Sequence, residues 1–213
     1  MVGVATSGVI GILALQGSVQ EHEAALRDLG RPVRLVRRSD QLEGLAGLIL
    51  PGGESTTFRR LMQQGSPNLL EAVQQAARSG MALFGTCAGL ILLAREVLEQ
   101  AEPGVEVPES ALQSLGLLDV AVERNGFGRQ RASFEAPVTL RGAIAREGDR
   151  VPGVFIRAPR IGRLGDGVEV LGELDGQPVL VRQGRVLGSC FHPELTEDRR
   201  VHRFFLRMAD EAL

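Results

Sequence analysis

Residues 83–92 read LFGTCAGLIL, two apolar runs joined by the short segment GTCAG. We interpret Met81 to Gly85 as a buried strand and the residues after Cys87 as the start of a helix. Gly85 and Gly89 lie two residues to either side of Cys87, so G-T-C-A-G has the form of the nucleophile elbow G-x-S-x-G, with a thiol in place of the hydroxyl. This stretch therefore predicts a strand–turn–helix unit within an α/β sheet.

The chain around this stretch supports a parallel sheet covered by helices. Up to Ala94, short apolar runs alternate with amphipathic runs, as βα units require. From Gly116 to Glu194, most runs read as strands separated by DG, GQ and QG turn signals. We therefore predict a single domain over residues 1–213: a three-layer α/β/α sandwich, flavodoxin-like, with a mostly parallel sheet and an antiparallel extension. The predicted elements before this extension are strands at 9–15, 32–36, 46–50 and 81–85 and helices at 20–30, 57–64 and 69–79; a loop follows at 99–110, and Thr196 would cap a C-terminal helix.

The composition narrows the classes of function. An apolar content of 44% in 213 residues allows a sizeable core, and a net charge of −2 gives no field suited to nucleic acid or a membrane surface. The apolar stretch VIGILAL is far shorter than the roughly 20 residues that span a bilayer. Two distant cysteines, with no basic and apolar leader, indicate a reducing compartment, so we expect a cytoplasmic protein.

All 24 basic residues are arginine. The chain therefore has no lysine amine to form a Schiff base and no P-loop lysine to hold a nucleotide phosphate. We expect the chemistry to use neither a cofactor nor a metal ion.

Cys87 stands where binding sites of open α/β sheets lie, at the carboxyl end of a strand. The unpaired N–H groups and the positive dipole end of the next helix favour a thiolate there, and the N–H of Ala88 can face an oxyanion. The alternative is an inert buried cysteine that only packs. For Cys190, core packing is the expected role, with a disulfide to Cys87 as the alternative.

A thiol nucleophile needs a base, and the chain has three histidines. His22 and His202 fall in charged helical stretches, where we expect solvated side chains. His192 ends a buried strand, and period-two alternation would send His192 and Glu194 to the same side. These residues then form a nucleophile, a base and an orienting acid with Cys87, although H-P-E alone also fits an ordinary strand exit.

The segment PGGEST at residues 51–56 follows the predicted strand 46–50. Consecutive glycines leave backbone N–H groups bare and adopt torsions closed to other residues, as a second oxyanion donor requires. The alternative is a plain turn before a helix capped by Ser55 or Thr56.

Several motifs together resemble one family. PGGEST, GTCAGLILLA, RNGFGRQ, FIRAP and FHPEL, with LALQGSVQEHEAAL near the start, look like the glutaminase subunit of pyridoxal 5'-phosphate synthase, a class I (triad) glutamine amidotransferase. The elbow and H-P-E are widespread among amidotransferases, whereas RNGFGRQ and FIRAP are narrower signals. The chain departs from the pattern at Gly126, where alanine or serine is usual, and in about eight residues before the first strand.

This resemblance implies a function and a set of roles. The triad would be Cys87, His192 and Glu194, with Gly53 and Ala88 as oxyanion donors. The implied activity is hydrolysis of L-glutamine to L-glutamate and ammonia through a cysteine thioester. The ammonia would pass to a separate (β/α)8-barrel synthase subunit that builds pyridoxal 5'-phosphate from ribose 5-phosphate and glyceraldehyde 3-phosphate. The residues implied to contact glutamine are Gly52, Gly53, Glu54, Arg124, Ile156 and Arg157.

Two other interpretations remain. The first is the glutaminase of another pathway, such as imidazole glycerol phosphate or anthranilate synthesis, whose usual elbow G-x-C-L-G differs at Ala88. The second is a thiol sensor or binding protein on a related fold, in which Cys87 is oxidised rather than acylated. That interpretation does not call for the late pair His192 and Glu194.

Overall fold

The centre of the protein is one large sheet. The computed structural model describes residues 8–64, 68–98, 114–124, 126, 133–146 and 149–211. In these residues nine strands form a sheet in the order β2 (Val33–Val36), β1 (Val9–Leu13), β3 (Leu45–Leu50), β4 (Ala82–Thr86), β12 (Val186–Ser189), β11 (Gln177–Gln183), β10 (Glu169–Leu174), β7 (Ser133–Leu140) and β8 (Arg150–Ile156). Neighbours from β2 to β12 pair in parallel, and neighbours from β12 to β8 pair antiparallel. The predicted parallel sheet with an antiparallel extension is confirmed.

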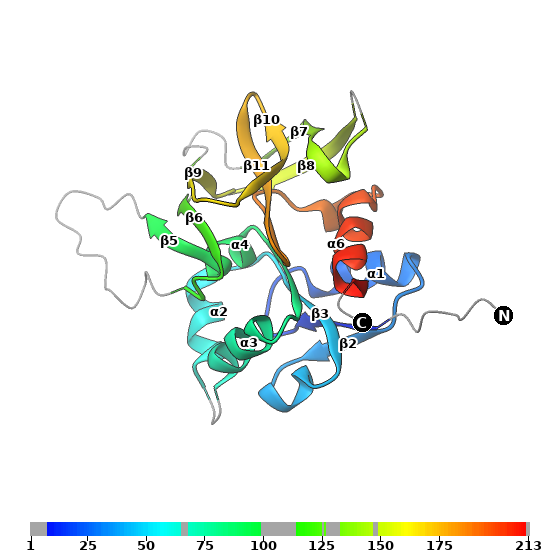
Figure 1. The fold of residues 1–213 in the computed structure, drawn as a ribbon, viewed down its shortest axis with the longest axis vertical. Coiled ribbons are helices and arrows are strands. Elements are labelled where there is room, and N and C mark those ends of the chain that lie inside the picture. The colour runs from blue at the N-terminus through cyan, green and yellow to red at the C-terminus, as the bar shows by residue number, and fades with distance from the viewer. Residues whose placement is uncertain are drawn as a thin grey trace.

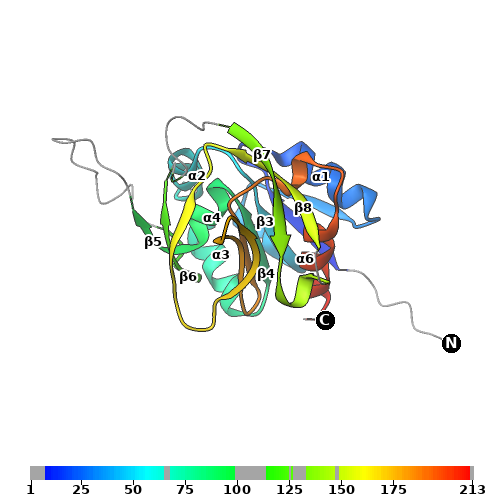
Figure 2. The ribbon, with the colours of Figure 1, turned by 90° about the horizontal axis from the view of Figure 1, so that it is seen from above.

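Helices cover both faces of the parallel part of this sheet. Helices α1 (Val19–Asp28) and α6 (Arg200–Asp210) lie on one face, and α2 (Ser55–Met62), α3 (Leu69–Arg78) and α4 (Ala88–Leu93) lie on the other, as Figure 1 and Figure 2 show. Because both faces are covered, β4 is buried along its whole length and β3 along all but its first residue, which explains their continuous apolar sequences. The three-layer arrangement follows the prediction.

A second, smaller sheet was not expected. It joins β5 (Ala94–Leu98) to β6 (Leu118–Glu123) in parallel, and β6 to β9 (Arg160–Leu164) antiparallel. Figure 2 shows it on the side of α4 away from α1 and α6. The chain leaves β6 at Arg124 and crosses from β8 to β9 through residues 157–159, so this sheet carries two predicted substrate-binding segments towards α4.

Thr196 does not begin the C-terminal helix. A 3-10 helix at Pro193–Leu195 ends there, with the Thr196 hydroxyl donating to the carbonyl oxygen of Pro193 at 3.1 Å, and α6 starts only at Arg200. The N-cap prediction is therefore wrong.

The predicted loop at 99–110 lies outside the described residues. No helix in the described part of the chain is long and apolar enough to cross a membrane.

Candidate active site

The predicted elbow is present at the junction of β4 and α4. Cys87 has φ +48° and ψ −102°, a left-handed torsion that costs a residue with a side chain on the order of 1–3 kcal/mol. A Cβ atom at Gly85 would lie 2.5 Å from the backbone of Gly89, and one at Gly89 would lie 1.9 Å from the carbonyl oxygen of Leu50. Both glycines are therefore needed for α4 to approach the sheet closely enough to present the sulfur at the strand ends.

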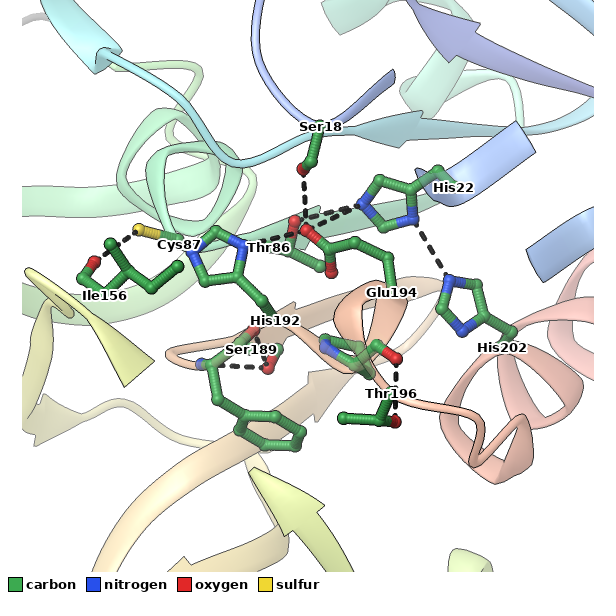
Figure 3. Close-up of polar contacts among 12 residues, drawn as sticks. Ser18, His22, Thr86, Cys87, Ile156, Ser189, His192, Glu194, Thr196 and His202 are labelled. Carbon is green, nitrogen blue, oxygen red and sulfur yellow. Dashed lines mark hydrogen bonds and ion pairs between the residues drawn. The ribbon is translucent and has the colours of Figure 1, made fainter. Parts of the chain in front are cut away.

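His192 and Glu194 lie beside this sulfur, in contact with each other. The imidazole Nδ1 of His192 is 2.8 Å from Glu194 Oε1 (Figure 3), and the ring lies close enough to Cys87 for the sulfur to raise its pKa. The expected pair is thus brought together, but the period-two argument for it is wrong. Strand β12 ends at Ser189, and the 3-10 helix at Pro193–Leu195 turns the chain so that the carboxylate folds back onto the ring.

The charges of the pair stabilise each other despite burial. Burial disfavours a charged His192, but the neighbouring Cys87 sulfur and the hydrogen bond with the Glu194 carboxylate outweigh it and raise the pKa of His192 to about 10. Burial likewise disfavours a charged Glu194, but its pKa is lowered by the positive edge of the neighbouring His22 ring and by hydrogen bonds from His192 and from Ser18 Oγ, which is 2.6 Å from Oε1. At neutral pH the pair is therefore an imidazolium and a carboxylate.

The prediction that His22 and His202 are solvated is wrong. Both side chains are 0% exposed, between the sheet and helices α1 and α6. The helical period contains the signal for this placement, because His22 shares a face with buried Ala25 and Leu26, and His202 shares one with Phe205.

A cavity of about 360 Å³ opens in front of Cys87. Of the predicted site residues, only Glu194 does not line it, since that side chain lies behind His192. The predicted residues that line the cavity are Gly52, Gly53, Glu54, Cys87, Ala88, Arg124, Ile156, Arg157 and His192. Sequence reasoning missed five further lining residues, Gly17, Ser18, Ser55, Ile91 and Leu195.

The PGG segment packs directly on the candidate catalytic residues. A Cβ atom at Gly52 would lie 2.2 Å from Cε1 of His192, so only glycine fits over this ring. The side chain of Gln16 holds the next peptide, because its Nε2 donates to the carbonyl oxygen of Glu54 at 2.5 Å and its Oε1 accepts the N–H of Glu54 at 3.2 Å. Gly53 lies between Gly52, which packs on the His192 ring, and Glu54, which Gln16 holds, so its position at the cavity wall is fixed.

Glu54, rather than Ser55 or Thr56, caps α2. Its carboxylate accepts the N–H groups of Thr56 at 2.9 Å and Thr57 at 2.7 Å, and the Thr57 hydroxyl at 2.5 Å. Partial burial would raise the pKa of Glu54, but these hydrogen bonds lower it to about 2. The cavity wall therefore carries a fixed negative charge at this point.

Two arginines, Arg124 and Arg157, also line the cavity. The Nη1 of Arg124 donates to Thr56 Oγ1 at 3.1 Å. Arg157, directly after β8, has φ +44°, and the carbonyl oxygen of Ile156 before it lies 3.8 Å from the sulfur of Cys87. Gly126, the departure noted in RNGFGRQ, is needed here because its Cβ would lie 2.2 Å from Cβ of Arg160.

Cys190 packs in the core, as predicted. Both cysteines are free, and Cys190 is 0% exposed in the apolar core. Burial raises the pKa of the Cys190 thiol far above its usual range. Cys87 is therefore the cysteine that can react with a molecule in the cavity.

A cysteine on an α/β elbow, backed by histidine and glutamate, is the arrangement of the class I glutamine amidotransferases, and solved structures of that fold are similar to this one. A structure described as a glutamine amidotransferase is 50% identical, with a TM-score of 0.82, covering 95% of this chain and 99% of that chain. The sequence model of the SNO glutamine amidotransferase family matches residues 12–211, and the chain belongs to that family. Its relatives include a "Pyridoxal 5'-phosphate synthase subunit PdxT" of Thermus thermophilus, which is 53% identical over 203 residues (95% of this chain, 98% of the relative). The protein of the same name from Geobacillus kaustophilus is 50% identical over 203 residues (95% of each chain).

Proposed function

We propose that this protein is the glutaminase subunit of a pyridoxal 5'-phosphate synthase, which hydrolyses L-glutamine to L-glutamate and ammonia. The observation that carries the proposal is the buried alignment of Cys87, His192 and Glu194 at the wall of a cavity of about 360 Å³. Relatives that match 95% of the chain and bear the name of this synthase subunit support the choice of pathway over other glutaminases.

The geometry of the triad supports the following roles. The Cys87 thiolate attacks the side-chain amide carbon of glutamine, and the developing oxyanion accepts hydrogen bonds from the N–H groups of Gly53 and Ala88. His192, protonated on both ring nitrogens, gives its Nε2 proton to the departing ammonia. Water then cleaves the γ-glutamyl thioester with the neutral His192 as base, while Glu194 orients the ring throughout.

The remaining lining residues suit the α-amino acid end of the substrate. An arginine fork pairs with an α-carboxylate at two points, and Arg124 and Arg157 both reach the cavity. The ionised carboxylate of Glu54 offers a partner for the α-ammonium group. The residues proposed to contact glutamine are Gly52, Gly53, Glu54, Arg124, Ile156 and Arg157.

The ammonia needs a protected route because in water it is mostly converted to ammonium, which is not a nucleophile. We propose that a (β/α)8-barrel synthase subunit docks on this chain and receives it. The absence of lysine from all 213 residues fits this division, since Schiff-base chemistry must then belong to the partner. We further propose that residues 1–213 act as one glutaminase domain in the cytoplasm, where both free cysteines stay reduced.

A glutamate-release assay with and without a synthase subunit tests the proposal. We expect weak activity in the isolated chain, strong stimulation by the partner, and complete loss in Cys87→Ala. The matched control is Cys190→Ala, which should retain activity because that thiol lies in the core. Full activity in Cys87→Ala would overturn the assignment, and activity unchanged by the partner would overturn the docking proposal.

A further inference from the structure

All three histidines of the chain lie in one buried row behind Cys87. His192 contacts Glu194, and His22 follows, with Nε2 3.5 Å from Glu194 Oε1 and 3.2 Å from Thr86 Oγ1. His22 Nδ1 is in turn 3.0 Å from His202 Nε2 (Figure 3). The row therefore runs from the cavity to helix α6, and of its three histidines the proposed mechanism uses only His192.

The proton positions in this row follow from which atoms can donate. Glu194 is ionised and only accepts, so a lone pair on His22 Nε2 would face a negative oxygen 3.5 Å away. A proton on Nε2 avoids this repulsion, and the Thr86 hydroxyl oxygen at 3.2 Å can accept it as well. His22 Nδ1 then carries a lone pair and accepts the proton of His202 Nε2. This leaves a lone pair on His202 Nδ1, a buried atom that has no hydrogen-bond partner among the residues that the structure describes. If the protons were instead on Nδ1 of both rings, an unpaired N–H would be buried at His202 Nδ1, and a lone pair of His22 Nε2 would face the Glu194 carboxylate. This arrangement costs more free energy.

Both rings are uncharged in this arrangement. Each is 0% exposed, and burial lowers the pKa of His22 and lowers the pKa of His202 to about 3. The titratable groups that act electrostatically on His22 are Glu194, His192 and Glu21, beside its hydrogen bond with His202. Those that act on His202 are His22, Glu194 and Arg199. Glu194 and Glu21 favour a charged His22, but burial outweighs them.

We propose that His22 and His202 are positioning residues for the glutaminase reaction: His202 holds the tautomer of His22, and His22 points its N–H at the Glu194 carboxylate, keeping it ionised and aimed at His192. This inference rests on the proposed function. Neutral N–H donors suit the task, because they stabilise the carboxylate without adding a cation that would compete with the His192 imidazolium.

Nuclear magnetic resonance of the untagged full chain labelled with ¹⁵N-histidine tests the proton positions directly. Three histidines give three ring patterns, which His22→Gln and His202→Gln assign. At pH 7 we expect His22 and His202 to be neutral with the proton on Nε2, and His192 to be charged. A charged His22, or an Nδ1–H tautomer of either ring, would overturn the proposal.

Variants at His202 test the consequence for catalysis. His202→Gln keeps an N–H that can reach His22 Nδ1, whereas His202→Leu fills similar space without a donor. We expect His202→Leu to lower kcat about tenfold, with KM changed by less than about twofold, and to lower the titration midpoint of His192 by about one pH unit. We expect His202→Gln to retain kcat within about threefold.

Phe205→Leu is the matched control for packing. Phe205 contacts Phe84, which packs against His22 and His202, but it has no polar group. Equal effects of Leu and Gln at position 202, or a similar shift of the His192 midpoint in Phe205→Leu, would contradict a positioning role. If His202→Leu does not fold, the tautomers of the wild-type chain decide the question. A wild-type chain inactive on glutamine even with its synthase partner would refute the proposed function alone, since the tautomers do not depend on turnover.

Discussion

Gly52→Ala is the substitution whose effect the structure defines best. The added Cβ would lie 2.2 Å from Cε1, 2.8 Å from Nδ1 and 3.3 Å from Nε2 of His192. Carbon atoms in contact sit about 3.5–4.0 Å apart, so either the imidazole or the PGG segment must move by more than about 1 Å. The ring has little freedom to move without losing its bond to Glu194, which is 2.8 Å long, and its alignment with Cys87.

A displacement of about 1 Å in a reacting group costs about 100-fold in rate, equivalent to about 2.7 kcal/mol of transition-state stabilisation. We therefore expect kcat/KM for glutamine, measured by glutamate release with a saturating synthase subunit, to fall at least about 100-fold in Gly52→Ala. The backbone at this position needs no left-handed torsion, so the fold should persist, as circular dichroism would check.

Gly47→Ala is the control for a crowded glycine remote from the cavity. Its Cβ would lie 2.8 Å from the ring of Phe205, under α6, so it should lower stability while leaving kcat/KM of the folded protein unchanged. A Gly52→Ala enzyme with wild-type kcat/KM would refute the claim that His192 is held against the PGG segment during catalysis.

Two other predictions concern Glu194 and the buried histidines. Ser18→Ala removes the hydroxyl 2.6 Å from Glu194 Oε1, and we expect the free energy of unfolding in urea to fall by about 2 kcal/mol; an unchanged urea midpoint would mean that this hydrogen bond contributes nothing. Acid should destabilise the wild type between pH 6.5 and about 3, because the unfolded chain binds a proton that buried His202, whose pKa is lowered to about 3, does not accept. The slope from this group is up to about 1.4 kcal/mol per pH unit, and a urea series across this range should show a shallower slope in His202→Gln.

The elbow and its sheet could be predicted because local sequence determines them. Gly85 and Gly89 can only be explained by close backbone approach, and the apolar runs of β3 and β4 are those of strands buried on both faces. The pairing of residues 192 and 194 was right for a wrong reason, since a 3-10 turn rather than strand alternation brings the two side chains together.

The buried histidine row could not be predicted as easily from the sequence, because it depends on tertiary contacts between α1, β4 and α6. Charged neighbours such as Glu21, Glu23 and Arg203 made both helices look solvated, although His22 and His202 share helical faces with buried apolar residues. Strands β5 and β9 were missed because their exposed positions are occupied largely by charged and glycine residues, which hide the strand pattern.

The central claim, that Cys87 is the nucleophile of an amide hydrolysis, is tested most directly by mass spectrometry of the intact chain quenched in acid during turnover of glutamine. We predict a γ-glutamyl adduct on the peptide that contains Cys87 and none on the peptide that contains Cys190. Two results together would contradict the account: a wild-type chain that turns over glutamine without any adduct on Cys87, and a Cys87→Ala variant that remains active.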